Sequence, residues 1–488
     1  MFRSNSRMAL AIILVILVLA PMLAGPASAR DFPEEEYENT IYIGASVSLS
    51  GDYEFEGGQA LCGMKAAIDW INSNGGIEIA GKNWFFKLVF EDDKSDPQKA
   101  VEIYRSLYDQ GIRFFLAPYS ESLANEVAIA LNKYDIVLML YGPSSDRLAR
   151  QYKNTIQISS TTYNKYHNLF NMLKDLGAKN VIIVSDGSAY AANSVKAVIR
   201  AANNAGIEVS ATINYLGEGS IKKMLDTDYK GRYSLLLILS DSLSRFKDIA
   251  IEAYNSLSTF EMVAGDVVVS FPHFYLEIGG SRAENIMGVS EWEERDLYSK
   301  EMATQFKADW YGPANTTEWA EYYSKYCKTG VPGSVAASAS AAVFALANYI
   351  YWAGSTNPAA VKAKAPDIFM LTFYGPIRVD DKGYQVGHIP LIIQWIDGYK
   401  KIVYPDKYAD AEPRYPASNW MERGVTKTMT EEGAGEEQGQ AEDTVQTPVQ
   451  TGAEAGEQEE GGFPVAVAVA VIVIVAAIAG FMALRGRK

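Results

Sequence analysis

The residues best placed to do chemistry together are two adjacent carboxylates, Asp92 and Asp93, which follow the apolar run of residues 84–90. Paired acids can hold a metal ion, or share the roles of general acid and general base. Acids also occur where a strand simply returns to solvent, and ion-pair or surface networks account for many such pairs. We favour this second interpretation, a solvated strand end.

The other motifs argue against an enzyme or a metalloprotein. The three histidines, His167, His273 and His388, lie far apart and lack the spacing of metal ligands. No Gly-x-Ser-x-Gly nucleophile motif occurs in the sequence. Residues 76–82 (GIEIAGK) have the spacing of a phosphate-binding loop, but Asn83 stands where Ser or Thr would hold the metal, and the stretch follows a helix pattern. We expect no catalytic residue, no metal and no cofactor.

Length and charge narrow the class further. A chain of 488 residues is longer than one core usually serves, so two domains are expected. The formal net charge is -15, and the sequence has no basic stripe that would hold phosphates. Nucleic acid is therefore excluded as a partner.

The two ends of the chain predict its compartment. Residues 1–29 read as a signal peptide, with two arginines, an apolar run and small residues before the cleavage point. Residues 463–484 are apolar throughout and long enough to cross a bilayer, and the basic tail of residues 485–488 should stay in the cytoplasm. The acidic, Gly- and Gln-rich residues 425–462 predict a disordered linker. We expect a cell-surface domain held outside by a C-terminal transmembrane helix.

The elements between these ends alternate between strand and helix patterns. Residues 41–77 begin with the alternation of a strand, pass through a Gly-rich loop and continue with helical spacing. Similar units repeat along the chain, with residues 267–270 and 286–289 predicted as the last strands of a second sheet. The pattern predicts an α/β fold of two doubly wound parallel-sheet lobes with a cleft between them. We assign residues 37–158 and 290–388 to the first lobe, and residues 159–289 and 389–410 to the second.

The order of the motifs resembles the solute-binding proteins of ABC importers, specifically the branched-chain amino-acid (Leu/Ile/Val) binding type. The resemblance spans most of residues 41–404 and rests on short pieces in the right order. These pieces are Ser48-Leu49-Ser50-Gly51, Gly75-Gly76-Ile77, Asp92-Asp93 with Asp96-Pro97, Gly111-Ile112, Pro118-Tyr119-Ser120, residues 142–148 and Tyr374-Gly375-Pro376. The resemblance implies a periplasmic-binding-protein type I fold, a hinged pair of lobes that closes on a small ligand.

The resemblance also implies the ligand-binding residues. In this family the charged groups of the ligand are held by a serine-rich loop after the third strand and by the turn after the fourth. The matching residues here are Ser120, Glu121, Ser122, Gly142, Pro143 and Ser144. Tyr190 matches a ligand-contacting tyrosine of the second lobe, and Asp241, Phe271 and Phe55 correspond more loosely to further contacts.

Two features depart from the family pattern or add to it. Glu121 stands where the family has a small hydroxyl residue, so it either points away to cap its helix, which we slightly favour, or selects a cationic or ammonium-bearing ligand. The stretch of residues 268–273 lacks an acid that would match the family's ammonium partner. Cys62 and Cys327 are the only cysteines; outside the cell a disulfide is chemically allowed, and we predict that they pair.

The expected function is that of an extracellular binding protein and not of an enzyme. It would capture a small polar ligand, an amino acid or a related amide or amine, by lobe closure and deliver it to an ABC permease with its ATPase subunits. The alternative is a ligand-sensing surface receptor domain of the same fold, which would need a partner because residues 485–488 are too few to signal. A C-terminal anchor after a hydrophilic stalk is similar to the arrangement in archaeal binding proteins.

Overall fold

The computed structural model describes residues 38–327, 331–417 and 420. The predicted signal peptide, linker, transmembrane helix and cytoplasmic tail lie outside these residues. The described part contains two large α/β sheets and a small third sheet, which are treated in turn.

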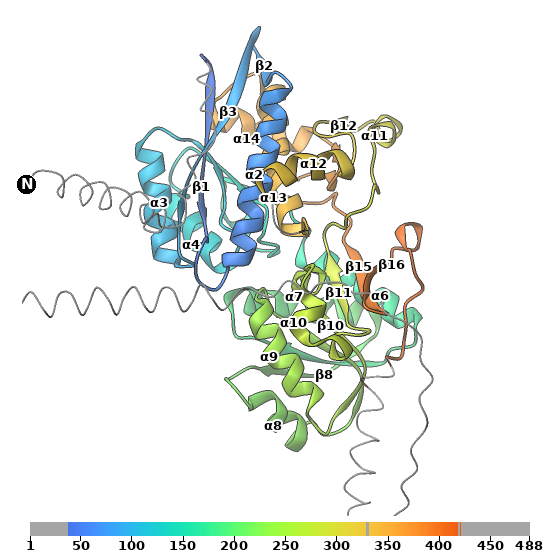
Figure 1. Ribbon diagram of the computed structural model, residues 1–488. Helices are drawn as coiled ribbons and strands as arrows, with labels where there is room; N and C mark the ends of the chain where they lie inside the picture. The colour runs from blue at the N-terminus through green and yellow to red at the C-terminus, as the bar shows by residue number, and fades with distance from the viewer. Residues whose placement is uncertain (1–37, 328–330, 418–419, 421–488) are drawn as a thin grey trace, which may run out of the picture. The chain divides into compact units, whose positions relative to one another are not determined.

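The first sheet has the strand order β2–β3–β1–β4–β5–β6 (Figure 1). Its strands are β1 (Thr40–Val47), β2 (Ile77–Ile79), β3 (Lys82–Asp92), β4 (Phe114–Leu116), β5 (Val137–Leu140) and β6 (Thr155–Gln157). Its helices are α2 (Glu54–Ser73), α3 (Pro97–Asp109), α4 (Glu121–Leu131) and α5 (Leu148–Gln151). β2 pairs antiparallel with β3, and the other pairings in this sheet are parallel. The loops that follow β1, β4 and β5 therefore meet at one edge.

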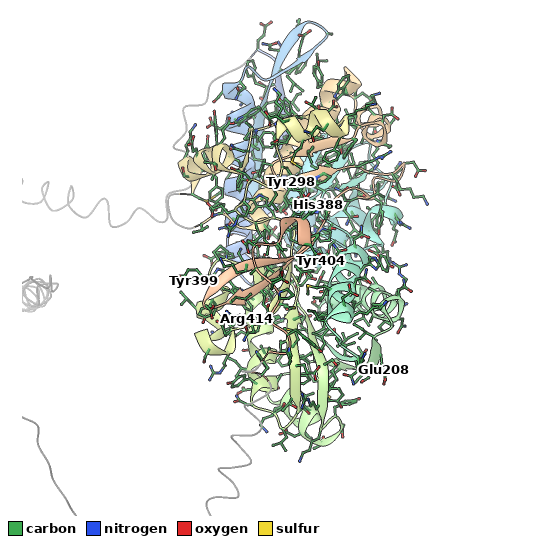
Figure 2. The ribbon with its side chains drawn as sticks, turned by 90° about the vertical axis from the view of Figure 1, so that its right-hand side faces the viewer. Glu208, Tyr298, His388, Tyr399, Tyr404 and Arg414 are labelled. Carbon is green, nitrogen blue, oxygen red and sulfur yellow. A yellow bond between two sulfur atoms is a disulfide. The ribbon has the colours of Figure 1, made fainter. Side chains whose placement is uncertain are left out.

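The second sheet has the order β16–β15–β11–β10–β9–β7–β8. Its strands are β7 (Asn180–Ser185), β8 (Glu208–Asn214), β9 (Arg232–Leu239), β10 (Thr259–Gly265), β11 (Met287–Ser290), β15 (Leu391–Ile396) and β16 (Tyr399–Tyr404). Its helices are α6 (Thr162–Asp175), α7 (Ala189–Ala205), α8 (Ser220–Thr227), α9 (Leu243–Tyr254), η2 (Val267–Ser270), α10 (Phe274–Ile278) and η3 (Gly280–Arg282). β7 to β11 pair in parallel, while β15 and β16 add an antiparallel hairpin at the edge. Tyr399 and Tyr404, labelled in Figure 2, mark the two ends of β16.

The predicted α/β fold is confirmed, but one predicted strand is wrong. Residues 267–270 form a 3-10 helix, η2, because the side chain of Asp266 accepts a hydrogen bond from the Val267 N–H and turns the chain. The strand is β10, directly before it, whose sequence TFEMVAG mixes polar with apolar residues. The β-branched residues of η2 have a stronger local preference for a strand than the residues of β10. The segment that pairs with β9 is nevertheless β10, so the strand forms there.

The remaining elements include the long helix α13 (Ser334–Ala353), which packs against α2 and α14. The others are α11 (Lys300–Phe306), β12 (Asp309–Trp310), α12 (Thr316–Tyr326), α14 (Pro358–Lys364), η4 (Ala365–Asp367), β13 (Met370–Thr372), β14 (Gly375–Ile377) and η5 (Asp406–Tyr408). Within the described residues, α13 is the helix long and apolar enough to cross a membrane, yet 94% of its apolar window is buried in the fold. It lies along α2 (Figure 1), where a Cβ on Gly63 would meet the Ala336 carbonyl oxygen at 2.2 Å. We identify α13 as a core helix, because glycine lets the two backbones approach this closely.

A disulfide joins α2 to the end of α12. Cys62 and Cys327 are bonded, with their Cα atoms 5.8 Å apart and a sequence separation of 265. A cross-link that closes so long a loop restricts the unfolded chain, so we expect the double substitution Cys62→Ser and Cys327→Ser to lower the free energy of unfolding by about 2–5 kcal/mol. Urea unfolding of the variant measures this loss, and reduction of the wild-type protein should reproduce it. Equal midpoints for the oxidised, reduced and substituted proteins would contradict the prediction.

Candidate functional site

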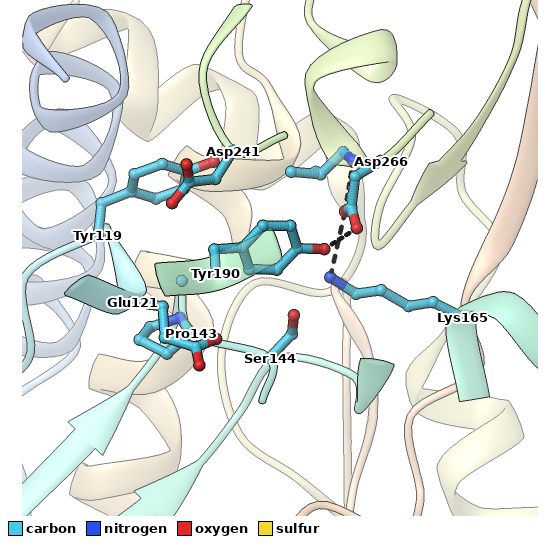
Figure 3. Close-up of a pocket in the computed structure, with 10 residues that line it drawn as sticks. Tyr119, Glu121, Pro143, Ser144, Lys165, Tyr190, Asp241 and Asp266 are labelled. Carbon is cyan, nitrogen blue, oxygen red and sulfur yellow. Dashed lines mark hydrogen bonds and ion pairs between the residues drawn. The ribbon is translucent and has the colours of Figure 1, made fainter. Parts of the chain in front are cut away.

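A cavity lies where loops from the two large sheets meet (Figure 3). The empty space in it is about 270 Å³ with the solvent at its mouth included. Side chains and backbone from both sheets line it: Tyr119, Glu121, Gly142, Pro143, Ser144, Lys165, Tyr190, Asp241, Asp266 and Val267. The carboxyl edges of parallel strands are where α/β proteins bind ligands, so this is the candidate binding site.

Local sequence explains why the first sheet presents these residues. Ser120 is the N-cap of α4 and its hydroxyl accepts a hydrogen bond from the Ser122 N–H at 3.3 Å, which makes Glu121 the first residue of the helix. Gly142 follows β5, and a Cβ there would stand 2.2 Å from the Tyr119 carbonyl oxygen. Only glycine therefore allows the loops after β4 and β5 to touch.

One side of the cavity carries two buried carboxylates from opposite sheets. Glu121 is 2% exposed and Asp241, which follows β9, is 7% exposed. The Asn193 amide of α7 donates to Glu121 Oε1 at 3.0 Å, and the Ser120 hydroxyl donates to Asp241 Oδ2 at 3.4 Å. Burial raises the pKa of Glu121 to about 7, and burial together with the nearby carboxylate of Asp186 raises the pKa of Asp241 to about 7.

The other side holds a buried ionic cluster centred on Lys165 of α6. Its ammonium lies 2.8 Å from Glu291 Oε1 and 3.6 Å from Asp266 Oδ1, and all three side chains are at most 6% exposed. Burial alone would lower the pKa of Lys165, but Asp266 and Glu291 together raise it. Burial would likewise raise the pKa of Glu291, but Lys165 lowers it. The lysine therefore stays charged at neutral pH.

Further hydrogen bonds fix both acids of this cluster. The hydroxyls of Tyr166 and Tyr190 both donate to Asp266 Oδ2, the first at 2.6 Å. The backbone N–H of Ser160 donates to Glu291 Oε2 at 3.0 Å, and the Tyr374 hydroxyl donates to the same oxygen. Both carboxylates are thus occupied by groups of the protein itself.

A second cavity of about 250 Å³ adjoins the first and reaches the start of α13. Its lining is Tyr119, Tyr141, Gly142, Lys165, Val267, Glu291, Ser334, Val335 and Ser338, so four residues line both cavities. No side chain caps α13, whose first N–H groups have no partner within the helix. The two cavities therefore adjoin each other beside Lys165.

The structure places the sequence-predicted site residues in three groups. Six of them line the first cavity: Glu121, Gly142, Pro143, Ser144, Tyr190 and Asp241. Ser120 and Ser122 lie just behind it, joined hydroxyl to hydroxyl at 2.8 Å. Phe55 and Phe271 are absent from the cavity lining and instead contact each other, with ring centroids 5.4 Å apart.

Two interpretations of acidic residues change with the structure. Glu121 does not point away to cap its helix; it lines the cavity and pairs with Asn193. Asp93 is not a solvated strand end, because it is fully buried and accepts hydrogen bonds from the hydroxyls of Ser46 and Ser48 at 2.8 and 2.6 Å. Asp92 accepts from Ser50 and from the Leu49 N–H. The Asp92–Asp93 pair therefore stabilises the end of β1 and the loop that follows it through these hydrogen bonds.

Sequence reasoning missed Lys165, Asp266 and Glu291. Asp266 follows β10 directly, so correct placement of that strand would have put it at the ligand-binding edge, where an acid was expected and not found. Lys165 lies on the first turn of α6, where a lysine in a helix pattern is normally exposed. No local signal distinguishes it from a surface lysine.

The sequence of this chain is similar to those of known binding proteins and of a receptor. Residues 40–226 match the family model described as periplasmic binding protein. The chain is 28% identical over 171 residues to the Leu/Ile/Val-binding protein BraC3 of Rhizobium johnstonii, covering 33% of this chain and 44% of that protein. It is 32% identical over 113 residues to subunit 1 of the mouse gamma-aminobutyric acid type B receptor, covering 23% of this chain and 11% of the receptor subunit. The chain thus spans less than half the length of the curated relatives it matches.

The fold is also that of a solved transport protein. The crystal structure of the branched-chain amino acid transporter substrate-binding protein LivJ of Streptococcus pneumoniae, in complex with isoleucine, superposes with a TM-score of 0.60 at 18% identity. The match covers 75% of this chain and 100% of the other. The resemblance and the type I fold stated from the sequence are confirmed.

Proposed function

From the fold and family signature of a periplasmic binding protein, we propose that this protein captures a small polar ligand, an amino acid or a related amide or amine, and delivers it to an ABC import permease. The cavity between the two large sheets carries this proposal. Its walls come from both sheets, so a ligand within it would bridge them and favour the closed arrangement over an open one. Relatives named for Leu/Ile/Val binding and for branched-chain amino-acid transport support the ligand class.

The arrangement in the cell is part of the same proposal. Residues 37–158 with 290–388, and residues 159–289 with 389–410, would act as the two lobes on either side of the cavity. A C-terminal transmembrane helix would keep them at the outer surface of the cytoplasmic membrane, close to the permease. Such an anchor would keep the binding domain at high effective concentration near the permease, so no pool of freely diffusing binding protein would be needed.

A second candidate is a ligand-sensing surface receptor domain that acts through a partner. The similarity to the gamma-aminobutyric acid type B receptor subunit favours it, because the match falls on a receptor relative. Capture of the permease by the full chain in detergent, with ligand present, would distinguish transport from sensing.

Ligand binding can be tested directly on the part of the chain that carries the cavity. We expect one class among amino acids, amides and amines to raise the melting temperature in a concentration-dependent way. A ligand at 100 times its dissociation constant stabilises the native state by about 2.7 kcal/mol, a shift that a thermal melt resolves. If no compound in these classes shifts the melt, the proposed function is wrong.

A further inference from the structure

The cavity has more carboxyl groups than cations in its described lining. Its described lining holds the carboxylates of Glu121, Asp241 and Asp266 against one cation, Lys165. That cation is already shared between Asp266 and Glu291. A further acid, Glu56 of α2, is 3% exposed and close enough to Asp241 to interact with it electrostatically. Burial raises the pKa of Glu121 and of Asp241 to about 7, so a cation that enters this space can draw both carboxyl groups into their ionised form.

Only one side of the cavity has carboxylate oxygens free to bind. Asp266 is occupied by Lys165, Tyr166 and Tyr190, as described above. By contrast, Glu121 Oε2 and Asp241 Oδ1 are buried and have no hydrogen-bond partner among the described residues. Figure 3 shows these two carboxylates on one side of Tyr190, with Lys165 and Asp266 on the other. A buried acceptor without a hydrogen-bond donor destabilises the folded protein, because its lost hydration is not replaced.

The surroundings of these two oxygens suit a cation. The rings of Tyr119 and Tyr190 line the same cavity and are 7% and 5% exposed. Aromatic faces and carboxylates together form the usual environment of a bound ammonium group, because both present negative potential to it. The two acids come from opposite sheets, so a cation between them would hold the sheets together.

We propose that the ligand is a small, net cationic amine, such as a basic amino acid or a diamine, whose charged nitrogen binds between Glu121 and Asp241. This inference rests on the proposed function, since it names the ligand class of the same cavity. The nitrogen donates to Glu121 Oε2 and Asp241 Oδ1, the two acceptors that the protein leaves open. Asp266 does not bind the cationic group of the ligand, because its carboxylate is already paired with the ammonium group of Lys165. A neutral amino acid binds more weakly, since its carboxylate cancels the charge of its single ammonium group and it brings no net positive charge to the two acids.

The test compares cationic with neutral and anionic probes on the full chain in detergent and on three variants. The probes are L-lysine, L-ornithine and 1,4-diaminobutane, against L-leucine, L-isoleucine and benzoate. Glu121→Gln and Asp241→Asn remove one charge each and keep the side-chain shape. Asp248→Asn, on the exposed face of α9, removes the same charge away from the cavity and serves as the matched control.

We expect at least one cationic probe to bind at least tenfold more tightly than L-leucine, by titration calorimetry. Glu121→Gln and Asp241→Asn should each weaken that binding tenfold or more, while Asp248→Asn changes it less than twofold. Both cavity variants should melt no lower than the wild type, because each replaces a buried carboxyl group, which is costly to ionise there, with a neutral amide. Tighter binding of L-leucine, or affinity for the amine unchanged in both variants, would overturn this inference and leave the proposed function standing. Tighter binding of benzoate would overturn this inference and the ligand class of the proposed function. Failure of every probe would overturn both.

Discussion

Replacement of Lys165 by methionine is expected to lower the free energy of unfolding by about 3–5 kcal/mol. The substitution removes the ammonium that lies 2.8 Å from Glu291 and 3.6 Å from Asp266, and both acids are then buried without a counter-charge. Loss of one partner from a buried ion pair is costly because the remaining charge keeps its desolvation penalty. Chemical unfolding of the variant in urea measures the loss.

Two further variants make this prediction specific to the buried cluster. Lys247→Met breaks an exposed ion pair with Glu277 and should cost less than about 1 kcal/mol. Neutralisation of the acids in the same background, as Lys165→Met with Asp266→Asn and Glu291→Gln, should restore much of the stability, since no unpaired charge remains. The interpretation is wrong if Lys165→Met and Lys247→Met unfold at the same urea concentration.

The second large effect is on the pH dependence of stability. The carboxyl group of Glu121 has a pKa raised by burial to about 7, compared with an ordinary value of 4.5. A group whose pKa is higher in the folded than in the unfolded state stabilises the fold below the unfolded pKa, and this contribution is lost as pH rises through the folded pKa. The free energy of unfolding should therefore fall as pH rises from about 4.5 to above 7. The size of this change is about 3 kcal/mol.

Several groups that face Glu121 set the size of this shift. Asn193, Ser145 and Lys165 stabilise its ionised form, whereas Asp241 opposes ionisation, and burial outweighs them all. Other titrating groups contribute to the pH profile, so the quantity to measure is the difference between Glu121→Gln and the wild type. The stability of the variant relative to the wild type should rise by about 3 kcal/mol between pH 4 and pH 8.5.

The same ionisation governs affinity for a cation in the opposite direction. Below pH 7 the carboxyls of Glu121 and Asp241 are protonated and must lose a proton before they can pair with an ammonium group. Affinity for a cationic probe should then fall up to tenfold per pH unit for each proton released.

A difference in stability between Glu121→Gln and the wild type that is flat between pH 4 and pH 8.5 would show that Glu121 ionises as an ordinary exposed acid.

The sequence by itself was sufficient for the α/β fold and for the segments that carry the cavity. The pattern of residues 41–77 predicted a strand, a loop and a helix, and the structure has β1 and α2 there, because these elements depend on local alternation and helical spacing. The loops after β4 and β5 were named from the family resemblance, and they lie at one edge because parallel strands bring their carboxyl ends together. Six residues named from those loops and from family resemblance do line the cavity.

Only the tertiary structure determined which charged residues line the cavity and which of them are already paired with another group of the protein. Asp266 was hidden because the pairing of β10 with β9, and not the local pattern, sets where that strand ends. Lys165 is a core residue only because Asp266 and Glu291, 101 and 126 positions further along the chain, converge on it. Burial and partner depend on contacts between distant segments, and no spacing within one segment records them. The sequence therefore located the cavity, and the contacts across it determined its charge.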